Sequence, residues 1–505
     1  MPMKKTIALT LPWLFLLALL SCSKTDKTEN NSLVIIDSEK IDKESLGDAQ
    51  KFSSTIPALL LLSPLLSLDG NGIPHNFLAE EIKLFPGKNV IEIRLREGVK
   101  FHDGRRLTVD DIVGAINKLR VAEVRYKNLK VETLNSSLLR LTNNAPVVDV
   151  NSLLADIAVL APESSDQPVG TGPFRFGRWL NNGVELVANK DYFEGRPKLD
   201  KVIYLYEEDE RKRLYKLLKG EADLLVFLSP EVARFLEKDT RFYLKKIPFS
   251  YSAIHFNNES ALFRDKVVRK AVSMAIDRDS LIEKGFKDEG VKTSHPFQPE
   301  MLTKSESPDY QPREAARLLK EAGWRDRNKD GVLEKAGRRL RFLLYYDKDY
   351  KEYTKVLDIM SQHLFEVGIE MEGVPVTYSE FRKKWMKAGD YDAFLKGIST
   401  SDSANFTTWH SSFIGNPDGC NFSRYSNGEV DRLLEQLRVS GDIKTKKMIY
   451  GKILEIISKD VPAAFLYNDM IYTAVNKRFK GAEDFMGDVY SVYKIKDWSL
   501  NEDYR

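Results

Sequence analysis

The sequence predicts an α/β protein built from more than one folding unit, and three observations support this prediction. The chain has 505 residues, more than a single hydrophobic core usually supports, so two or three units are expected. With 42% hydrophobic and 30% charged residues, the composition is typical of a globular protein. Between residues 339 and 398, helix-like and strand-like segments alternate, which indicates an α/β unit with a largely parallel sheet.

The amino-terminal residues form a separate segment. The positive stretch MPMKK precedes an apolar run that is too short and wrongly flanked for a permanent membrane span, so residues 1–21 are expected to be an export signal. The stretch LLSC (19–22) resembles the lipobox of bacterial lipoproteins, whose cysteine carries lipid and becomes the first residue of the mature protein. We therefore expect Cys22 to hold the chain on the extracytoplasmic side of a membrane through a polar tether. An ordinary cleaved signal is the alternative.

The segments before residue 240 read as units of strand and helix. Residues 90–119 begin with the alternation of a half-buried strand and continue as a helix capped by Thr108. Residues 211–239 predict a helix that ends at Gly220, a buried strand, and a second helix capped by Ser229.

The rest of the chain continues this alternation. Residues 249–257 alternate like a strand, and residues 265–286 predict one long helix because their apolar positions have helical spacing. The remaining predicted helices are 311–324, 353–368, 379–389, 428–438 and 446–460, and the remaining strands are 339–346, 369–376 and 391–398, with an apolar segment at 461–475.

Motifs give little sign of catalysis. The patterns G-x-S-x-G, H-E-x-x-H, G-x-x-x-x-G-K-[ST] and paired C-x-x-C do not occur. The 77 basic and 74 acidic residues nearly cancel and are interspersed, which argues against a nucleic-acid partner. The six histidines are scattered without an i, i+4 pair, so we expect neither a metal site nor another cofactor. Cys420 has no partner cysteine in the mature chain and is expected to be a buried or incidental thiol.

Residues 326–337 contain part of a calcium-loop pattern. Asp326, Asp330 and Gly331 occupy the first, fifth and sixth positions, but the twelfth position, which should be a bidentate glutamate, is Gly337. The segment therefore predicts a structural turn rather than a calcium site.

Six phrases of the sequence, in this order, resemble the family-5 extracellular solute-binding proteins of ABC importers, the peptide and nickel group. The resemblance covers nearly the whole mature chain. The phrases are REGVKFHDGRRLTVDDIVGAI (96–116), VGTGPFRFGRW (169–179), NKDYFEGRPKLDKVIY (189–204), FNNESALFRDKVVRKAVSMAIDRDSLIE (256–283), YQPREAARLLKEAGWRDRNKDGVLEKAGRRLRFLLYY (310–346) and RYSNGEVDRLLEQL (424–437).

This resemblance implies a fold and a division of the chain. It implies the type II periplasmic-binding-protein-like fold, in which two α/β lobes with mixed sheets are joined by a hinge, with an extra small subdomain in lobe one. The implied segments are 1–21 (lipoprotein signal peptide), 22–60 (tether and start of lobe one), 61–164 (small subdomain), 165–255 (lobe one), 256–461 (lobe two) and 462–505 (return to lobe one).

The resemblance also implies a binding protein rather than an enzyme. Such a protein would capture a peptide or similar small ligand between its lobes as a monomer and deliver it to an ABC permease, because a ligand that contacts both lobes stabilises the closed form. Three alternatives stay open: a binder of a nickel chelate or haem, for which His410 near the implied cleft is an argument, a secreted lipoprotein hydrolase, and a sensory or adhesive surface lipoprotein.

The implied binding residues lie in the segment 395–413. In peptide-binding relatives an aspartate pairs with the α-amino group of the ligand, and Asp402 is the only acid in this segment, so the resemblance assigns it that role. Asn405, Phe406 and Trp409 are further candidates for ligand binding. The alternatives are a surface-loop or helix-cap role for Asp402 and a core position for the two aromatic residues.

Overall fold

The computed structural model describes residues 31–504, apart from several internal segments. The predicted signal peptide, Cys22 and the tether as far as residue 30 lie outside the described residues. The other residues outside the description are 43–45, 47–54, 71, 86–88, 123–125, 144–149, 162–166, 286–289, 299–300, 303–309, 351, 417–418, 439 and 441.

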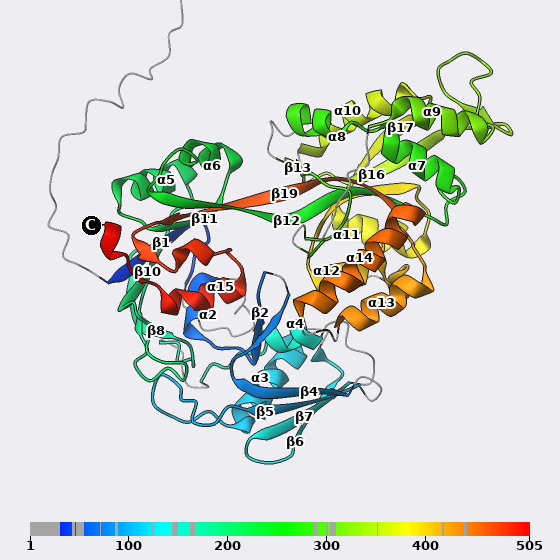
Figure 1. Ribbon diagram of the computed structural model, residues 1–505. Helices are drawn as coiled ribbons and strands as arrows, with labels where there is room; N and C mark the ends of the chain where they lie inside the picture. The colour runs from blue at the N-terminus through cyan, green and yellow to red at the C-terminus, as the bar shows by residue number, and fades with distance from the viewer. Residues whose placement is uncertain are drawn as a thin grey trace, which may run out of the picture.

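A mixed sheet of eleven described strands runs through the molecule (Figure 1). Its strands are β1 (Ser32–Asp37), β8 (Phe174–Leu180), β9 (Gly183–Ala188), β10 (Lys201–Tyr206), β11 (Leu224–Leu228), β12 (Phe242–Phe256), β13 (Gly290–Lys292), β16 (Arg341–Asp347), β17 (Glu370–Val376), β18 (Ala393–Ser399) and β19 (Ala463–Asn476). The order is β17-β16-β18-β12-β19-β11-β1-β10-β9-β8, and β13 pairs with β19. Within this sheet, β1 is parallel to β10 and β11, and β16 is parallel to β17 and β18, as the alternation at 339–398 predicts.

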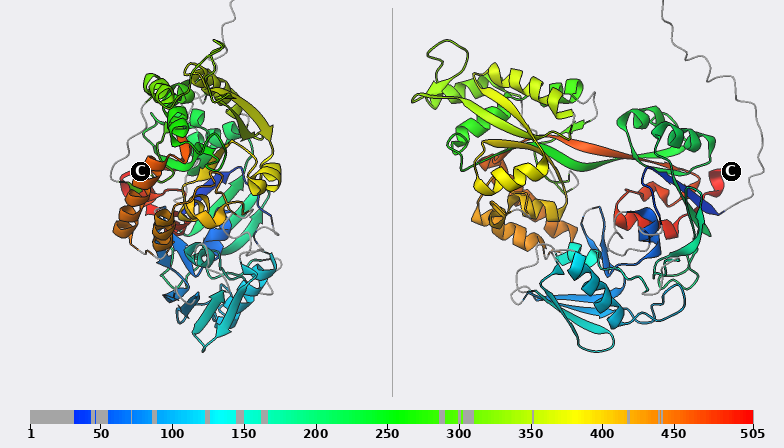
Figure 2. Two further views of the ribbon diagram at one scale, coloured as in Figure 1. Left: turned by 90° about the vertical axis from the view of Figure 1, so that its right-hand side faces the viewer. Right: turned by 180° about the vertical axis from the view of Figure 1, so that it is seen from behind.

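The two longest strands, β12 and β19, form an antiparallel ribbon that links the two halves of the sheet (Figures 1 and 2). Residues 242–248 pair with 470–476 on the side where β19 also pairs with β11. Residues 250–256 pair with β18 and with the other end of β19. We call the part that holds β1 and β8–β11 the first lobe and the part that holds β16–β18 the second lobe.

The first lobe packs short helices against its sheet. Asp209 caps α5 (Glu210–Lys219), and Gly220 ends that helix with a left-handed φ of 73°, which satisfies the helix carboxyl end. Ser229 caps α6 (Pro230–Leu236) through a hydrogen bond from Val232 N at 3.3 Å. The helix end at Gly220 and the helix cap at Ser229 match the predictions. The helices are α2 (Ile56–Leu61), α5 (Glu210–Lys219), α6 (Pro230–Leu236) and α15 (Val489–Tyr493).

The second lobe carries most of the long helices. Its apolar side chains form two clusters, one around Phe256 and Phe342 and the other around Phe394 and Trp409. The helices are α7 (Lys266–Ala275), α8 (Arg278–Ser280), α9 (Pro312–Glu321), α10 (Glu352–Phe365), α11 (Tyr378–Phe381), α12 (Asp402–Trp409), α13 (Gly428–Arg438) and α14 (Ile443–Asp460).

A third unit lies below both lobes in the view of Figure 1. It holds a separate antiparallel sheet in the order β4-β5-β7-β6 with its own apolar core, and a hairpin of β2 and β3 extends from it. Its elements are β2 (Leu66–Leu68), β3 (Pro74–Asn76), β4 (Ala79–Phe85), β5 (Val90–Leu95), α3 (Val109–Ala122), β6 (Leu129–Thr133), β7 (Leu138–Asn143) and α4 (Val150–Ala155). The predicted residue limits of the lobes and subdomain stay predictions.

The long helix predicted at 265–286 is wrong as a single helix. Helix α7 ends at Ala275, Ile276 is extended at φ −94° and ψ 117°, and Asp277 caps a new short helix. The break lets the buried Arg278 guanidinium donate from Nε to the Phe465 carbonyl of β19 at 2.7 Å. A continuous helix would carry this side chain elsewhere, so the tertiary hydrogen bond outweighs local helical periodicity.

The segment 326–337 contains the predicted turn. The Asp326 carboxylate accepts from Lys329 N at 2.8 Å and from Gly331 N at 3.1 Å, and Asp330 accepts from Val332 N at 3.0 Å. The Asp330 carboxylate also pairs with Arg339. These carboxylates therefore serve the backbone of the turn.

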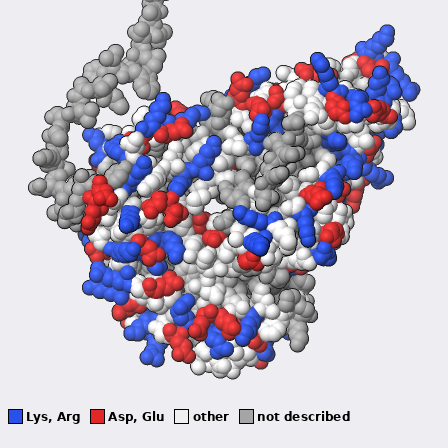
Figure 3. Space-filling model, in the orientation of Figure 1, with Lys and Arg blue, Asp and Glu red and all other residues white. Residues whose placement is uncertain are grey.

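Charges on the surface are mixed in sign. On the face shown in Figure 3, lysine and arginine side chains alternate with aspartate and glutamate over all three units. Within the described part of the chain, no helix has the length and apolar character needed to cross a bilayer.

Candidate functional site

A cleft of about 940 Å³ opens beside the ribbon that links the two lobes. This volume lies in the range of sites for small organic ligands. Its walls come from the β2–β3 hairpin (68–70), the ribbon (247–249 and Ile471), the second lobe (399–401), β11 and the carboxy-terminal part of the first lobe (484–491). A ligand in this cleft would therefore contact both lobes and the third unit.

Three large apolar side chains of the cleft wall are exposed. Phe227 is 55% exposed, Phe249 is 56% exposed and Met486 is 40% exposed, and all three line the cleft. Exposed apolar side chains that converge on one concavity are typical of a binding surface, because a ligand removes them from water.

Irregular strand pairing places the two phenylalanines. The register of β11 against β19 shifts between Leu225 and Leu228, and Phe227 there has a left-handed φ of 53°. The register of β12 against β19 shifts between Pro248 and Ser250, which leaves Phe249 outside the pairing. A β-bulge turns a side chain away from the regular alternation of a strand. Both bulges thus direct a phenylalanine to the cleft.

Two carboxylates stand near each other in the cleft wall. Asp69 accepts from Ile73 N at 3.0 Å and lies 3.1 Å from His75 Nε2, whose ring stacks on Tyr490 at 3.9 Å. Asp488 caps α15 by accepting from Ser491 N at 2.9 Å. Burial raises the pKa of Asp488, and the charge of Asp69 raises it further. The same cleft is lined by Lys494, so a ligand there meets acidic and basic side chains together.

Asp402, the predicted partner of a ligand α-amino group, already contacts a cation of the protein. It lies in the first turn of α12, which Ser401 caps. Its Oδ2 is 2.6 Å from Lys446 Nζ, and its Oδ1 accepts from the Tyr450 hydroxyl. Lys446 Nζ also donates to the carbonyl of Gly72 at the tip of the β2–β3 hairpin.

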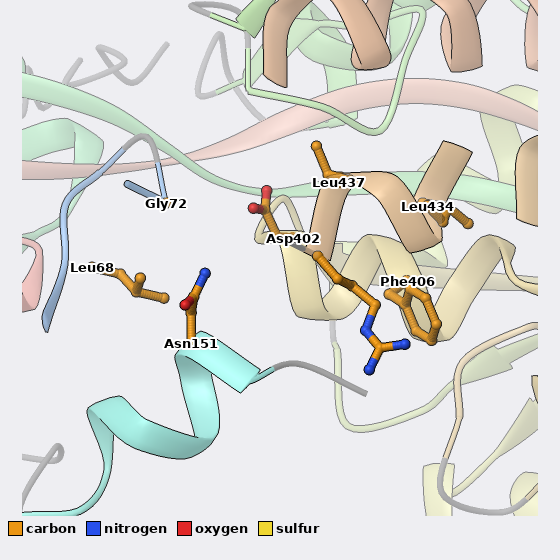
Figure 4. A pocket seen from close by; sticks show the side chains of 8 residues that line it. Leu68, Gly72, Asn151, Asp402, Phe406, Leu434 and Leu437 are labelled. Carbon is orange, nitrogen blue, oxygen red and sulfur yellow. The ribbon is translucent and has the colours of Figure 1, made fainter. Parts of the chain in front are cut away.

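Asp402 and Phe406 face a small pocket next to the larger cleft, and Leu68 lines both (Figure 4). The pocket lies where the hairpin and α4 meet the second lobe, with Gly72 and Asn151 on the opposite wall. The Phe406 ring stacks on His410 at 4.7 Å and lies under the Arg438 guanidinium at 4.8 Å.

Asn405 and Trp409 are fully buried. Asn405 Nδ2 donates to the Thr400 carbonyl at 3.0 Å, which supports the turn before α12. Trp409 packs in the second-lobe core, 5.9 Å from the Phe465 ring. Neither residue lines the larger cleft. A ligand contact for any of the four predicted residues stays a prediction.

His410, the argument for a metal ligand, faces acidic side chains of α13. Its Nε2 is 3.5 Å from Glu435 and its Nδ1 is 4.0 Å from Asp431. Across the residues that the structure describes, no group of three or more histidine, cysteine, aspartate or glutamate side chains is arranged to hold a metal ion.

The sequence prediction missed Phe227 and Phe249. Phe227 lies in LLVFL, a run that reads as an uninterrupted buried strand, and Phe249 begins an alternating segment in which it takes an ordinary place. Nothing local signals the bulge at Phe227. The Pro248 ahead of Phe249 is the one usable hint, since proline within a sheet is confined to edges and bulges.

Comparison with known proteins agrees with this architecture. Residues 74–418 match the family described as bacterial extracellular solute-binding proteins, family 5 middle. The oligopeptide-binding protein AppA of Bacillus subtilis is 28% identical over 462 residues, which cover 84% of this chain and 83% of the relative. The nickel-binding protein NikA of Staphylococcus aureus is 23% identical over 408 residues, which cover 78% of this chain and 80% of the relative. A solved structure of the Bacillus subtilis AppA in complex with a nonapeptide has a TM-score of 0.63 at 27% identity and covers 93% of this chain and 99% of that one.

Proposed function

Because the chain belongs to the family-5 bacterial extracellular solute-binding proteins of ABC importers, we propose that it captures peptides between its lobes and delivers them to an ABC permease. The observation that carries this proposal is the cleft of about 940 Å³, whose walls come from both lobes. The relative AppA is an oligopeptide-binding protein, which supports a peptide as the ligand.

The chemistry of the cleft suits a peptide. Phe227, Phe249 and Met486 offer apolar surface to side chains, and the carboxylates of Asp69 and Asp488 offer a place for an ammonium or guanidinium group. A ligand that contacts both lobes stabilises the closed form by the difference between its contacts in the closed and open forms. The permease then recognises that closed form, and the ligand leaves chemically unchanged.

The proposed mature protein is a monomer that Cys22 anchors by lipid on the extracytoplasmic side of the membrane. The LLSC sequence supports this step, and mass spectrometry of the membrane-extracted protein tests it. A Cys22→Ala variant is expected to lose the lipid mass and to leave the membrane fraction, because stable anchoring needs more than one acyl chain and these chains attach at this residue.

The family resemblance assigns to Asp402 the role of pairing with the α-amino group of the ligand. In this chain the Asp402 carboxylate contacts Lys446, so a ligand ammonium would have to share or replace that contact. The Asp69 and Asp488 wall is a second place for the same group.

Native mass spectrometry of the freshly purified protein tests the proposed function, because closed binding proteins retain ligand during purification. We expect the ligand that is released from the protein to have the mass of a peptide. Calorimetry then compares a peptide panel with a panel of nickel chelates and haem. Binding of the metal chelates or haem without peptide binding would overturn the peptide proposal and favour the alternative that the relationship to NikA suggests.

A further inference from the structure

Lys446 is a fully buried cation at the junction of the second lobe and the third unit. It extends from α14 of the second lobe, and its side chain is 1% exposed, against 24% for Asp402. Its Nζ lies 2.6 Å from Asp402 Oδ2 and donates to the carbonyl of Gly72, which belongs to the hairpin of the third unit. A single ammonium group therefore joins α12 and α14 to the opposite wall.

The hairpin is shaped to receive this ammonium. Gly72 has a left-handed φ of 68°, and a Cβ there would lie 3.1 Å from Lys446 Nζ and 3.2 Å from Asp402 Oδ2. The turn is closed by Gly72 N donating to the Asp69 carbonyl at 2.8 Å, while Ile73 N donates to the Asp69 carboxylate at 3.0 Å. A glycine carbonyl can thus approach the ion pair more closely than a residue with a side chain would allow.

The energetics favour Lys446 as a permanent partner of Asp402. A buried lysine without a carboxylate partner carries a large desolvation cost. Displacement of Lys446 by a ligand ammonium would leave that cost uncompensated, unless the lysine found new partners. The hydrogen bonds to Asp402 and to Gly72 therefore resist exchange with a ligand.

We propose that Lys446 is a built-in cation that occupies Asp402 and ties the β2–β3 hairpin to the second lobe, so that ligands of this protein need no free α-amino group at this point. This inference rests on the proposed function for its ligand class, which then includes peptides with a blocked amino terminus. The hydrogen-bonded link to the hairpin does not depend on the ligand and can be measured without one.

Ligand selectivity gives the first test. Calorimetry compares a peptide identified by native mass spectrometry, or a defined alanine-rich peptide, with its N-acetyl form. We expect the preference for the free amine, measured as the ratio of the two Kd values, to be about tenfold larger in Lys446→Met than in the wild type, because the variant removes the cation from Asp402 and leaves its contact with Tyr450. An unchanged ratio in Lys446→Met overturns the inference.

Hydrogen exchange in the ligand-free protein gives the second test. The amides of residues 72 and 73 are expected to exchange about tenfold faster in Lys446→Met. Gly72→Ala should also raise the rate, because it strains the turn and leaves both charges in place. Lys444→Met, at an exposed position of the same helix, is the matched control and should leave the rate unchanged.

The two tests separate this inference from the proposed function. If neither peptide form binds, the proposed function is wrong, and the exchange rates alone decide whether Lys446 holds the hairpin. If peptides bind but hairpin exchange is the same in all variants, the inference about Lys446 is overturned and the proposed function stands.

Discussion

Phe227 shows how one residue in an unfavourable conformation can mark a binding surface. A non-glycine residue held at a left-handed φ costs about 1–3 kcal/mol, which surrounding structure must offset. Phe227 has φ 53°, is aromatic and is more than half exposed, so burial of its own ring does not offset this cost. The bulged backbone directs the Phe227 ring into the cleft, and this placement is the function that we infer for the strained conformation.

Phe227→Ala and Phe249→Ala should each weaken binding of the cognate peptide. About half of each ring is exposed, and burial of that area by a ligand is worth about 1 kcal/mol, or roughly fivefold in Kd. Calorimetry checks the effect. Phe235→Ala is the matched control, because Phe235 is equally exposed, at 57%, on α6 but does not line the cleft. An equal loss of affinity in the control would remove the two phenylalanines from the binding surface.

Asparagine substitutions of two aspartates that cap helices should change the pH dependence of stability in opposite directions. Burial raises the pKa of Asp488 above its ordinary value of 3.8, so the wild type loses stability as pH rises from that value through the raised pKa. Hydrogen bonds from Thr445 lower the pKa of Asp442, so the wild type gains stability above the lowered pKa. Asparagine keeps each cap and removes each titration.

Thermal unfolding from below the lowered pKa of Asp442 to above the raised pKa of Asp488 measures this contrast. As pH rises, the stability of Asp488→Asn relative to the wild type should increase, and the stability of Asp442→Asn relative to the wild type should decrease. The two variants serve as controls for each other because both sit at a helix amino terminus. Parallel trends in the two variants would contradict the assigned environments of the carboxylates.

Single residues were predictable where their signal is local. The Ser229 cap and the Gly220 stop follow from the residue type and its immediate neighbours, and both are present. The Lys446 contact was not predictable, because it joins Asp402 to a lysine 44 positions away and to a glycine in another unit. The sequence therefore placed the carboxylate within a candidate segment but not the cation that it contacts.

At the scale of elements, helix ends were predicted better than helix continuity. The α5 stop follows from a local glycine, whereas the break at Ile276 combines the Asp277 cap with a hydrogen bond from Arg278 to a strand almost two hundred positions later. The parallel strands of the second lobe were predictable because strand and helix alternate over a short stretch of chain. Pairing of β12 with β19 has no such local signal.

A pair of glycine substitutions tests the assigned helix geometry. Gly220→Ala, at a left-handed φ of 73°, should destabilise the protein by about 1 kcal/mol. Gly114→Ala, inside α3 with no atom within 4 Å of the added Cβ, should stabilise it by up to about 1 kcal/mol. Urea unfolding that follows the first lobe and the third unit separately checks both signs, and a gain at Gly220 would contradict the left-handed stop.

At the scale of the whole molecule, the continuous sheet explains how two lobes can move and stay connected. The lobes meet through two strands, and their pairing shifts register between Pro248 and Ser250 and again between Ser252 and Ala253. Bulges weaken the ladder locally and increase its twist. Motion of one lobe against the other is therefore expected to concentrate at residues 248–253, beside the cleft wall that holds Phe249.

Small-angle scattering of the lipid-free protein tests this motion. Addition of the cognate peptide should lower the radius of gyration, because the closed form brings the lobes together around the ligand. The Phe227→Ala, Phe249→Ala double variant, at a peptide concentration that saturates only the wild type, should keep the larger radius. Hydrogen exchange should change at 248–253 on binding and not at the parallel strands β16 and β17. A measured heat of binding without change in radius would mean that the ribbon is rigid and that the ligand enters a cleft of fixed shape.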